Sequence, residues 1–396
     1  MSIDLLLLLI GVDIVTLVMA YCCFGLPALL YRKVYSALRL RQCDPNYAPT
    51  MSVFIPCKGA DGGLAANVEA FLRHQGPKAR LFFTVESEQD GAYPVIRQLI
   101  QDKPNVDLVV AGLAASCGQK NHNLLRAIER ASGKDDVYVF LDSVTSITRA
   151  QLRDLVVPLS DPQITVCVGF RWDVLKDKTL GERLRAFMIA LQWAVLNCPF
   201  ITATWGGGTA IRRRDFEALG VSEYWGKTVV DDMALARLLH DQKRKAVFVP
   251  TCVKEMDSSV ATVKGAILWF KRQALYLKFY LRAYWLCTIG LLLCCSINFV
   301  GFPILLVSSM IWPGRIMTPL AMVTGSFTLL MMVCCLATKR PAEDRHDRLS
   351  WFLFSPLYVV LACYAYLLGV WTRVLRWRGA SYRLDRQGYV LEIVRH

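Results

Sequence analysis

The sequence predicts an α/β fold with a mostly parallel sheet, joined to helical transmembrane and interfacial segments. Three observations lead to this prediction. Short apolar runs alternate with helical segments between residues 51 and 250, long apolar blocks flank this region, and polar residues follow the apolar runs. Strands that alternate with single helices form parallel sheets covered by helices on both faces. At 396 residues, the chain has room for about two domains.

The first apolar block, Leu5 to Leu30, is long enough to cross a membrane, which takes about 20 residues. It lacks a basic start and a small-residue cleavage site, so we interpret residues 1–40 as a retained anchor and keep a cleaved signal peptide as the alternative. The positive-inside rule places the end of this span in the cytoplasm. The basic residues concerned are Arg32, Lys33, Arg39 and Arg41.

Further apolar blocks fill residues 286–372, and a basic tail covers residues 373–396. The blocks are Tyr284 to Trp312, Met317 to Ala337 and Trp351 to Trp371. If all three crossed the membrane, the tail would lie on the far side, which its charge disfavours. Because Pro356 interrupts the third block near its start, we expect that block to be re-entrant or interfacial. The protein is then an integral membrane protein with residues 41–261 on the cytoplasmic face, that of the inner membrane in a bacterium.

The formal net charge of +14 suits an anionic membrane surface and a phosphate-bearing ligand. Basic chains often bind nucleic acid, but no recognised binding motif is present and the apolar blocks favour a membrane, so we expect no nucleic-acid partner. The 14 cysteines show no C-x-x-C spacing, which indicates reduced packing residues rather than a disulfide framework or a zinc site. The oligomeric state stays open.

The soluble middle of the chain alternates between the two kinds of element. Apolar runs predict strands at Met51 to Pro56, Arg80 to Glu86, Val106 to Val110, Val137 to Asp142, Ile164 to Gly169 and Ala246 to Pro250. Helical patterns lie at Gly63 to His74, Ala92 to Gln101, Gln119 to Ala131, Arg149 to Leu159 and Lys176 to Asn197. In such sheets ligands bind beyond the carboxyl ends of the strands, so the residues that follow each strand are the candidates for a site.

Charged residues follow the first three strands. Lys58 and Asp61 lie in a loop whose glycines allow a close backbone approach. The acidic cluster Glu86 to Asp90 follows the second strand, and a solvated turn is the plainer interpretation of it. Lys120 lies at the start of a helix after the third strand, where the helix dipole and the ammonium group can both meet a phosphate.

The fourth strand is wholly apolar and ends in Asp142. A carboxylate at the end of a buried strand needs a partner, and a divalent cation would serve. Farther along, Trp205 precedes three glycines that include Gly207. They make a floor without side chains beside a broad apolar wall, which suits a sugar ring; a tight turn with a core tryptophan is the alternative.

Asp231 and Asp232 lie where a loop turns into an amphipathic helix, so both carboxylates point away from the core. They either cap the helix, because acidic side chains favour its positive end, or carry chemistry. Residues 262–285 predict a second amphipathic helix, lying in the lipid headgroup plane. Its lysines recur at seven-residue spacing, at Lys264, Lys271 and Lys278.

With these residues assembled, the chain resembles the membrane-bound family-two glycosyltransferases with a GT-A, Rossmann-like fold. Among them it looks most like the ceramide glucosyltransferase group. The likeness rests on the N-terminal anchor, the Lys58 to Asp61 loop, Lys120 to Leu124, Asp142-Ser143, Asp231-Asp232, Trp377-Arg378-Gly379 and Tyr382-Arg383-Leu384.

The resemblance implies a role for each matching residue. Asp61, with Glu86 or Glu88, holds the uridine nucleotide, in a donor site that includes Lys58 and Lys120. Asp142 binds Mg²⁺ or Mn²⁺ on the diphosphate, and Asp232 is the base. The family's Q/R-x-x-R-W element appears here as Trp269-Phe270-Lys271-Arg272-Gln273, so an aromatic residue is missing. Ser87 and Val144 also depart from the family, since both stand where acidic residues are usual.

The reaction implied by the resemblance is the inverting transfer of one sugar from a UDP-sugar to the hydroxyl of a membrane lipid such as ceramide, diacylglycerol or a hopanoid. The acceptor and leaving-group side then includes Trp205, Gly207, Asp231, Trp269 and Arg272. Two alternatives stay open. One is a polyprenyl-phosphate glycosyltransferase or polysaccharide synthase, and the other is a catalytically silent lipid-binding membrane protein on the same fold.

Overall fold

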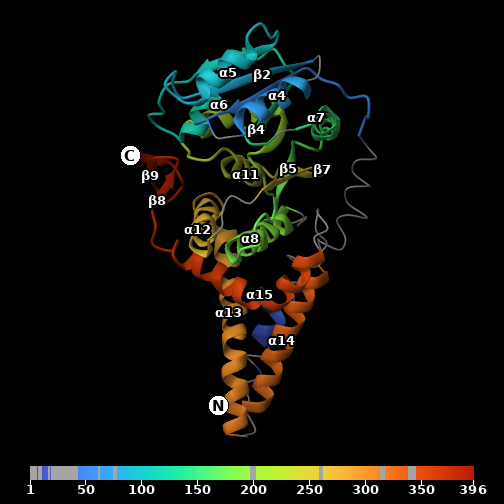
Figure 1. Ribbon diagram of the computed structural model, residues 1–396, viewed down its shortest axis with the longest axis vertical. Coiled ribbons are helices and arrows are strands. Elements are labelled where there is room, and N and C mark those ends of the chain that lie inside the picture. The colour runs from blue at the N-terminus through green and yellow to red at the C-terminus, as the bar shows by residue number, and fades with distance from the viewer. Residues whose placement is uncertain are drawn as a thin grey trace. The chain divides into compact units, whose positions relative to one another are not determined.

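The computed structural model divides the chain into two compact units (Figure 1). The first unit consists of Val34–Arg171, Phe200–Lys254 and Arg373–His396, and the second of Met1–Lys33, Trp172–Pro199 and Glu255–Thr372. The structure describes residues 7, 11–16, 18, 43–60, 63–74, 78–145, 147–196, 202–257, 262–312, 317–337 and 345–396. Most of the predicted anchor Leu5 to Leu30, and the predicted site residue Asp61, lie outside the described residues.

The first unit is built on a seven-stranded sheet with the strand order β3-β2-β1-β4-β6-β5-β7. Its strands are β1 (Met51–Pro56), β2 (Ala79–Val85), β3 (Val106–Val110), β4 (Val137–Leu141), β5 (Val166–Val174), β6 (Gly208–Arg212) and β7 (Ala246–Asp257). The strands from β3 to β4 run parallel, and β6 runs antiparallel to both β4 and β5. The predicted fold class, an α/β fold with a mostly parallel sheet, is therefore confirmed.

Alternating residues of the strands pack against helices on opposite faces of this sheet. From β1, Val53 and Ile55 join the buried cluster that α4, α5 and α7 cover, whereas Phe54 packs on the other face against Phe82 and Phe140. The helices of the unit are α4 (Leu64–His74), α5 (Ala92–Ile100), α6 (Gln119–Ala131), α7 (Arg149–Val156), α9 (Arg213–Ala218), α10 (Val221–Trp225) and α11 (Asp231–Asp241), with the 3₁₀ helix η3 (Val157–Ser160) after α7.

Strand β6 was not predicted, because its approach through three glycines indicates a turn. In the structure it lies inside the sheet, and Thr209, Ala210 and Ile211 are almost completely buried. It pairs with β4 through Gly208 to Arg212. Tertiary pairing on both sides thus makes a central strand from a segment that carries little strand signal of its own.

The C-terminal segment folds as a second, antiparallel sheet of the first unit. Its strands are β8 (Val374–Trp377), β9 (Ala380–Leu384) and β10 (Val390–Arg395), in the order β10-β9-β8. Leu375, Tyr382 and Leu384 are buried, whereas Arg376 and Arg383 are exposed. The sequence predicts only a basic tail here, because the arginines dominate the pattern. The buried alternate residues give the segment a packed face.

The second unit is helical. It contains α8 (Leu180–Leu196), α12 (Val263–Tyr280), α13 (Arg282–Ile311), α14 (Met317–Ala337) and α15 (Arg345–Leu367). Two helices of the described residues, Arg282–Ile311 and Leu349–Leu367, are long and apolar enough to cross a membrane, and a shorter apolar helix covers Met317–Val333. Large apolar side chains of α13 are exposed, such as Met310 at 73%. Exposure of such side chains is favourable in lipid and unfavourable in water. These features support the prediction of a membrane protein.

Two polar contacts connect distant segments within this second unit. Asn298 of α13 donates a hydrogen bond of 2.8 Å to Asp13, whose neighbours, residues 11–16, are helical. Lys278 of α12 donates to the carbonyl oxygens of Gly369, Val370 and Thr372, just after α15, at 2.7 to 2.9 Å. Lys278 therefore holds the chain that follows α15, whereas the sequence predicts a headgroup contact for it.

Candidate active site

The start of α6 is packed backbone to backbone against the segment that leads into α11. Gly118 precedes α6, and its amide donates to the carbonyl oxygen of Thr228 at 2.9 Å. A Cβ atom at position 118 would lie 2.0 Å from the carbonyl oxygen of Val229, so only glycine fits here. This close approach brings Lys120, on the first turn of α6, next to Asp231, the first residue of α11.

Lys120 is at the centre of an ion cluster. Its Nζ lies 2.9 Å from Oδ1 of Asp142 and 2.9 Å from Oδ2 of Asp231, and it donates to the carbonyl oxygen of Gly206 at 3.2 Å. Burial opposes the charge on Lys120, but the carboxylates of Asp142 and Asp231 outweigh it and raise the pKa of the ammonium group. The partner that Asp142 needs at the end of its buried strand is therefore Lys120.

The two carboxylates of the cluster differ in exposure. The side chain of Asp231 is 5% exposed, whereas that of Asp142 is 36% exposed. A Cβ atom at Gly206 would lie 2.5 Å from Oδ2 of Asp231 and 2.7 Å from Nζ of Lys120, so this glycine leaves the room that the ion pair fills. Asp231 is thus a buried anchor for Lys120, and Asp142 presents its carboxylate to solvent.

Asp232 makes different contacts. Its Oδ2 accepts from the amide of Gly206 at 3.2 Å, and its Oδ1 from the amide of Met233 at 2.6 Å. Asp232 therefore satisfies one amide of the first helical turn, as the capping interpretation expects, although the N-cap residue itself is Val230 and makes no side-chain bond. Burial and the neighbouring charge of Asp231 raise the pKa of Asp232 to about 7. A carboxyl group with such a pKa can take up a proton near neutral pH.

Trp205 folds back over the glycines that follow it. A Cβ atom at Gly207 would lie 2.2 Å from the indole ring of Trp205, and one at Gly208 would lie 3.3 Å from it. The half-buried ring also contacts Phe170 edge-on, with centroids 5.8 Å apart. The glycines therefore make room for the indole first of all, and its role toward a sugar stays a prediction.

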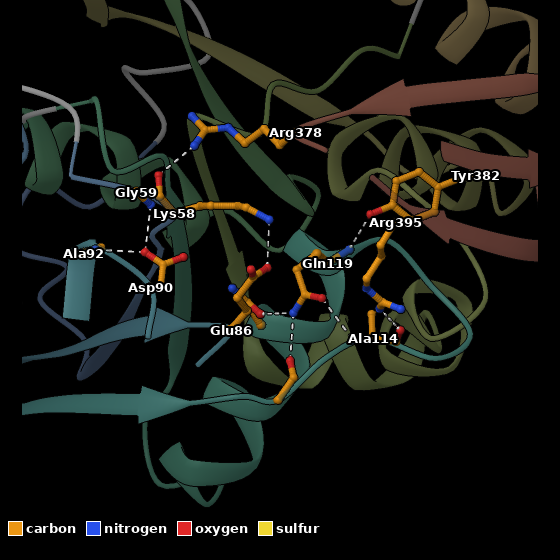
Figure 2. A network of polar contacts seen from close by, with 12 residues as sticks. Lys58, Gly59, Glu86, Asp90, Ala92, Ala114, Gln119, Arg378, Tyr382 and Arg395 are labelled. Carbon is orange, nitrogen blue, oxygen red and sulfur yellow. Dashed lines mark hydrogen bonds and ion pairs between the residues drawn. The ribbon is translucent and has the colours of Figure 1, made fainter. Parts of the chain in front are cut away.

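The predicted donor residues after β1 and β2 contact one another. Lys58 forms an ion pair of 2.9 Å with Glu86. Asp90 accepts from the amides of Gly59 and Ala92 at 2.8 and 2.9 Å, and so ties the loop after β1 to the start of α5 (Figure 2). Asp90 is not among the predicted site residues, although aspartate often accepts from the amide two residues farther on, as it does here from Ala92.

The remaining predicted residues make other contacts. Glu88 accepts a hydrogen bond of 3.2 Å from Tyr93, on the solvent side of α5. Trp269 and Arg272 are on α12, in the helical unit, where the guanidinium of Arg185 lies 4.9 Å from the ring centroid of Trp269. Arg185 is itself buried and pairs with Asp173 at 2.9 Å. The leaving-group role of Trp269 and Arg272 stays a prediction.

The chemistry of the donor set allows a divalent cation only with help from a substrate. Among the described residues, no group of three or more His, Cys, Asp or Glu side chains is placed to hold a metal ion. Mg²⁺ and Mn²⁺ are nevertheless often held by one or two carboxylates together with substrate phosphates and water. Asp142 fits that pattern, because its side chain is 36% exposed and can reach a metal ion that a substrate phosphate also holds.

Comparison with known protein families decides the class of the chain. The family described as glycosyl transferase family 21 matches residues 18–390. The chain belongs to this family. The match covers nearly the whole sequence, including the ion cluster, the apolar helices and strands β8 and β9 of the C-terminal sheet. The chain is therefore a glycosyltransferase, and the predicted ceramide glucosyltransferase-like resemblance is confirmed.

The individual proteins that resemble this chain share a third or less of their residues with it over the matched regions. The chain is 33% identical over 102 residues to ceramide glucosyltransferase 1 of Caenorhabditis elegans, a match that covers 24% of this chain and 22% of that relative. It is also similar to the structure of a mannosyltransferase from Pyrobaculum calidifontis in complex with GDP-Man and Mn²⁺, with 17% identity, a TM-score of 0.49, and coverage of 90% of this chain and 98% of that one. A third similar chain is GalNAc-T7 with UDP, GalNAc and Mn²⁺, with 16% identity, a TM-score of 0.37, and coverage of 59% of this chain and 50% of that one. With the observed sheet, the family assignment confirms the predicted GT-A fold.

Proposed function

We propose that this family 21 chain transfers a single sugar from a UDP-sugar to the hydroxyl of a membrane lipid, with inversion at the anomeric carbon. The observation that carries the proposal is the ion cluster of Lys120, Asp142 and Asp231 beside Asp232, at the carboxyl ends of the parallel strands. Ligands of parallel α/β sheets bind at that edge. The cluster combines a positive charge for a diphosphate with a carboxylate suited to a base.

Lys120 has the geometry to stabilise a leaving diphosphate. Its ammonium group is kept charged by two carboxylates and lies on the first turn of α6, where the helix dipole also favours an anion. Negative charge grows on the diphosphate as its bond to the sugar breaks, so a fixed positive charge stabilises the transition state more than the ground state. A Mg²⁺ or Mn²⁺ ion held by Asp142 and the diphosphate would add to this stabilisation as a Lewis acid.

Asp232 is the proposed base. A hydroxyl is a poor nucleophile, and a carboxylate that accepts its proton as the new bond forms contributes about 10² to 10⁴ in rate. Its neighbour Asp231 is already paired with Lys120, whereas Asp232 is bound by the amides of Gly206 and Met233. The two adjacent carboxylates thus have separate roles, because one fixes the leaving-group charge and the other is available to the acceptor.

The uridine end of the donor is proposed to lie near Lys58 and Glu86. Lys58 follows β1 and Glu86 follows β2, and the two residues form an ion pair. In the sheet these strands are neighbours in the order β2-β1-β4, and Asp142 follows β4. Residues that follow adjacent parallel strands share one edge of the sheet, so an extended nucleotide can reach from one pair to the next. Asp61 belongs to the same loop by its position in the sequence.

The proposed acceptor is a lipid because apolar helices make up much of the second unit and because a similar protein is called a ceramide glucosyltransferase. We place the first unit on the cytoplasmic face, where the basic residues near the anchor favour it.

The proposal is tested with the full chain purified into lipid nanodiscs and given a panel of UDP-sugars. Release of UDP and mass spectrometry of the lipids report the transfer. We expect UDP release from one UDP-sugar only when a lipid hydroxyl is present, together with a lipid product that is heavier by one sugar residue. No UDP release with any donor and a full lipid extract would contradict the proposal.

A further inference from the structure

The C-terminal sheet β8–β10 contacts the segments that follow β1, β3 and α10. Arg378, in the turn between β8 and β9, donates from Nη1 to the carbonyl oxygen of Lys58 at 2.8 Å. The hydroxyl of Tyr382, on β9, accepts from the amide of Gln119 at 3.3 Å. Arg395, on β10, donates to the carbonyl oxygen of Ala114. Figure 2 shows these three side chains reaching from the sheet to the loops.

The same sheet also holds the segment that leads to the aspartate pair. The amide of Val390 donates to the carbonyl oxygen of Lys227 at 2.9 Å, and Thr228 and Tyr389 form an isolated antiparallel bridge. The ring of Tyr389 contacts that of Tyr224 edge-on, with centroids 5.9 Å apart. Lys227 lies four residues before Asp231, so the sheet contacts both the start of α6 and the segment that leads into α11.

Tyr382 lies at a point where α6 lacks a cap of its own. The N-cap residue of α6 is Gly118, which has no side chain to bond the free amides of the first turn. Tyr382, which is 4% exposed, supplies an oxygen to the amide of Gln119, the residue before Lys120. The side chain of Gln119 in turn bonds Gly112, Ala114 and Asn123, and so links the cap to the whole loop after β3.

The turn that carries Arg378 is unusual. Trp377 pairs with Ala380, and the two residues between them, Arg378 and Gly379, have φ angles of +44° and +79°. Two positive φ angles are typical of the type I′ hairpin turn, in which asparagine followed by glycine is preferred. An arginine in this left-handed region is uncommon, because its Cβ crowds the backbone. Strained residues of this kind are often kept for a contact made elsewhere, and here the contact is with the backbone of Lys58.

From these contacts we propose that the C-terminal sheet positions the donor site, with Arg378 and Tyr382 as positioning residues for the Lys58 loop and for the helix start that carries Lys120. This inference rests on the proposed function, since it assigns the loops to a nucleotide. Neither residue is assigned to the reacting atoms. The sheet holds the loops in the arrangement that the diphosphate needs, so less ordering remains to be done when the donor binds.

The test uses two variants that keep the sheet folded. Tyr382→Phe removes the hydroxyl and keeps the buried ring. Arg378→Asn removes the guanidinium and places asparagine before glycine, the pair that this turn prefers. The matched control is Arg383→Asn, on the same sheet. The guanidinium of Arg383 forms an exposed ion pair of 2.8 Å with Glu392, which is also on the sheet and not in one of the loops.

Two readouts are taken on the full chain in nanodiscs: affinity for UDP with Mn²⁺ by calorimetry, and hydrogen exchange of peptides that cover residues 56–60 and 112–121. The loss of one hydrogen bond to a loop should weaken UDP binding about fivefold in each test variant. The rate of hydrogen exchange should also rise about fivefold, near Lys58 in Arg378→Asn and near Gln119 in Tyr382→Phe. The control should match the unchanged protein in both readouts, and thermal unfolding should be alike in all four proteins.

UDP binding and exchange in both test variants equal to those of the control would overturn the inference. Faster exchange with unchanged UDP affinity would overturn it as well, because the sheet would then support the fold without positioning the donor. If the unchanged protein fails to bind UDP, it is the proposed function that is refuted, and the exchange data still decide whether the sheet holds these loops.

Discussion

Replacement of Lys120 by methionine tests how the ion cluster is held together. The variant keeps the length of the side chain and leaves two carboxylates without their cation. Water can solvate the carboxylate of Asp142, whose side chain is 36% exposed. It reaches the carboxylate of Asp231 poorly, because that side chain is only 5% exposed. Breaking a buried pair by removal of one partner costs about 3 to 5 kcal/mol, and breaking an exposed pair about 0 to 1. We therefore expect a loss of about 3 kcal/mol, nearly all of it from Asp231.

For a domain of this size such a loss lowers the Tm by about 6 to 12 °C. Thermal unfolding in detergent, followed by circular dichroism, measures it. The double variant Lys120→Met/Asp231→Asn should recover more than half of the loss, because it removes the stranded charge. Lys227→Met is the control, since Lys227 pairs with Glu223 on the surface at 2.8 Å. A Tm for Lys120→Met within 2 °C of the control, or a double variant no more stable than the single one, would refute this reasoning about the cluster.

Three further outcomes follow from the site. The rate of transfer should fall about tenfold per pH unit below pH 7 and level off above it, because the pKa of Asp232 is raised to about 7 and a base acts only when deprotonated; a flat profile between pH 5 and 8 would contradict this. Gly207→Ala should displace the indole of Trp205 and weaken sugar transfer about tenfold with the fold intact, as circular dichroism and kinetics would show. Removal of divalent cations by EDTA should abolish transfer and Mn²⁺ restore it, whereas Asp142→Asn should need more Mn²⁺ for half-maximal rate.

Local patterns were enough to predict much of the first unit. The limits of β1, β3 and α6 in the structure, Met51–Pro56, Val106–Val110 and Gln119–Ala131, are those predicted from apolar runs and helical spacing. These elements carry strong signals of their own because their buried faces repeat with the period of a strand or a helix. The residues after their ends could be singled out for the same reason, since the end of an element is also a local feature.

The contacts between those residues could not be predicted in this way. The sequence presents Asp142 as a carboxylate in need of a cation, and only the packing of Gly118 against Val229 brings Lys120 to it. Likewise, nothing local distinguishes Asp231 from Asp232. Their separate roles follow from the partner that each finds across the fold, Lys120 for one and the Gly206 amide for the other.

Two strand regions were missed for opposite reasons. In β6 the glycines weaken the strand signal, and burial between β4 and β5 replaces it. In β8 and β9 the signal is present but brief. Leu375, Tyr382 and Leu384 alternate with arginines. When the segment is judged by its overall charge, the arginines hide this alternation. A search for period-two alternation around the Arg378-Gly379 pair would have indicated the hairpin.

The measurement that tests the account most directly compares transfer and UDP binding in Asp232→Asn. Asparagine keeps an oxygen for the Gly206 amide but cannot accept a proton from the acceptor at neutral pH. We predict that transfer falls at least about 100-fold, with the affinity for UDP unchanged within about threefold. Transfer at the rate of the unchanged protein would contradict the role of Asp232 as the base.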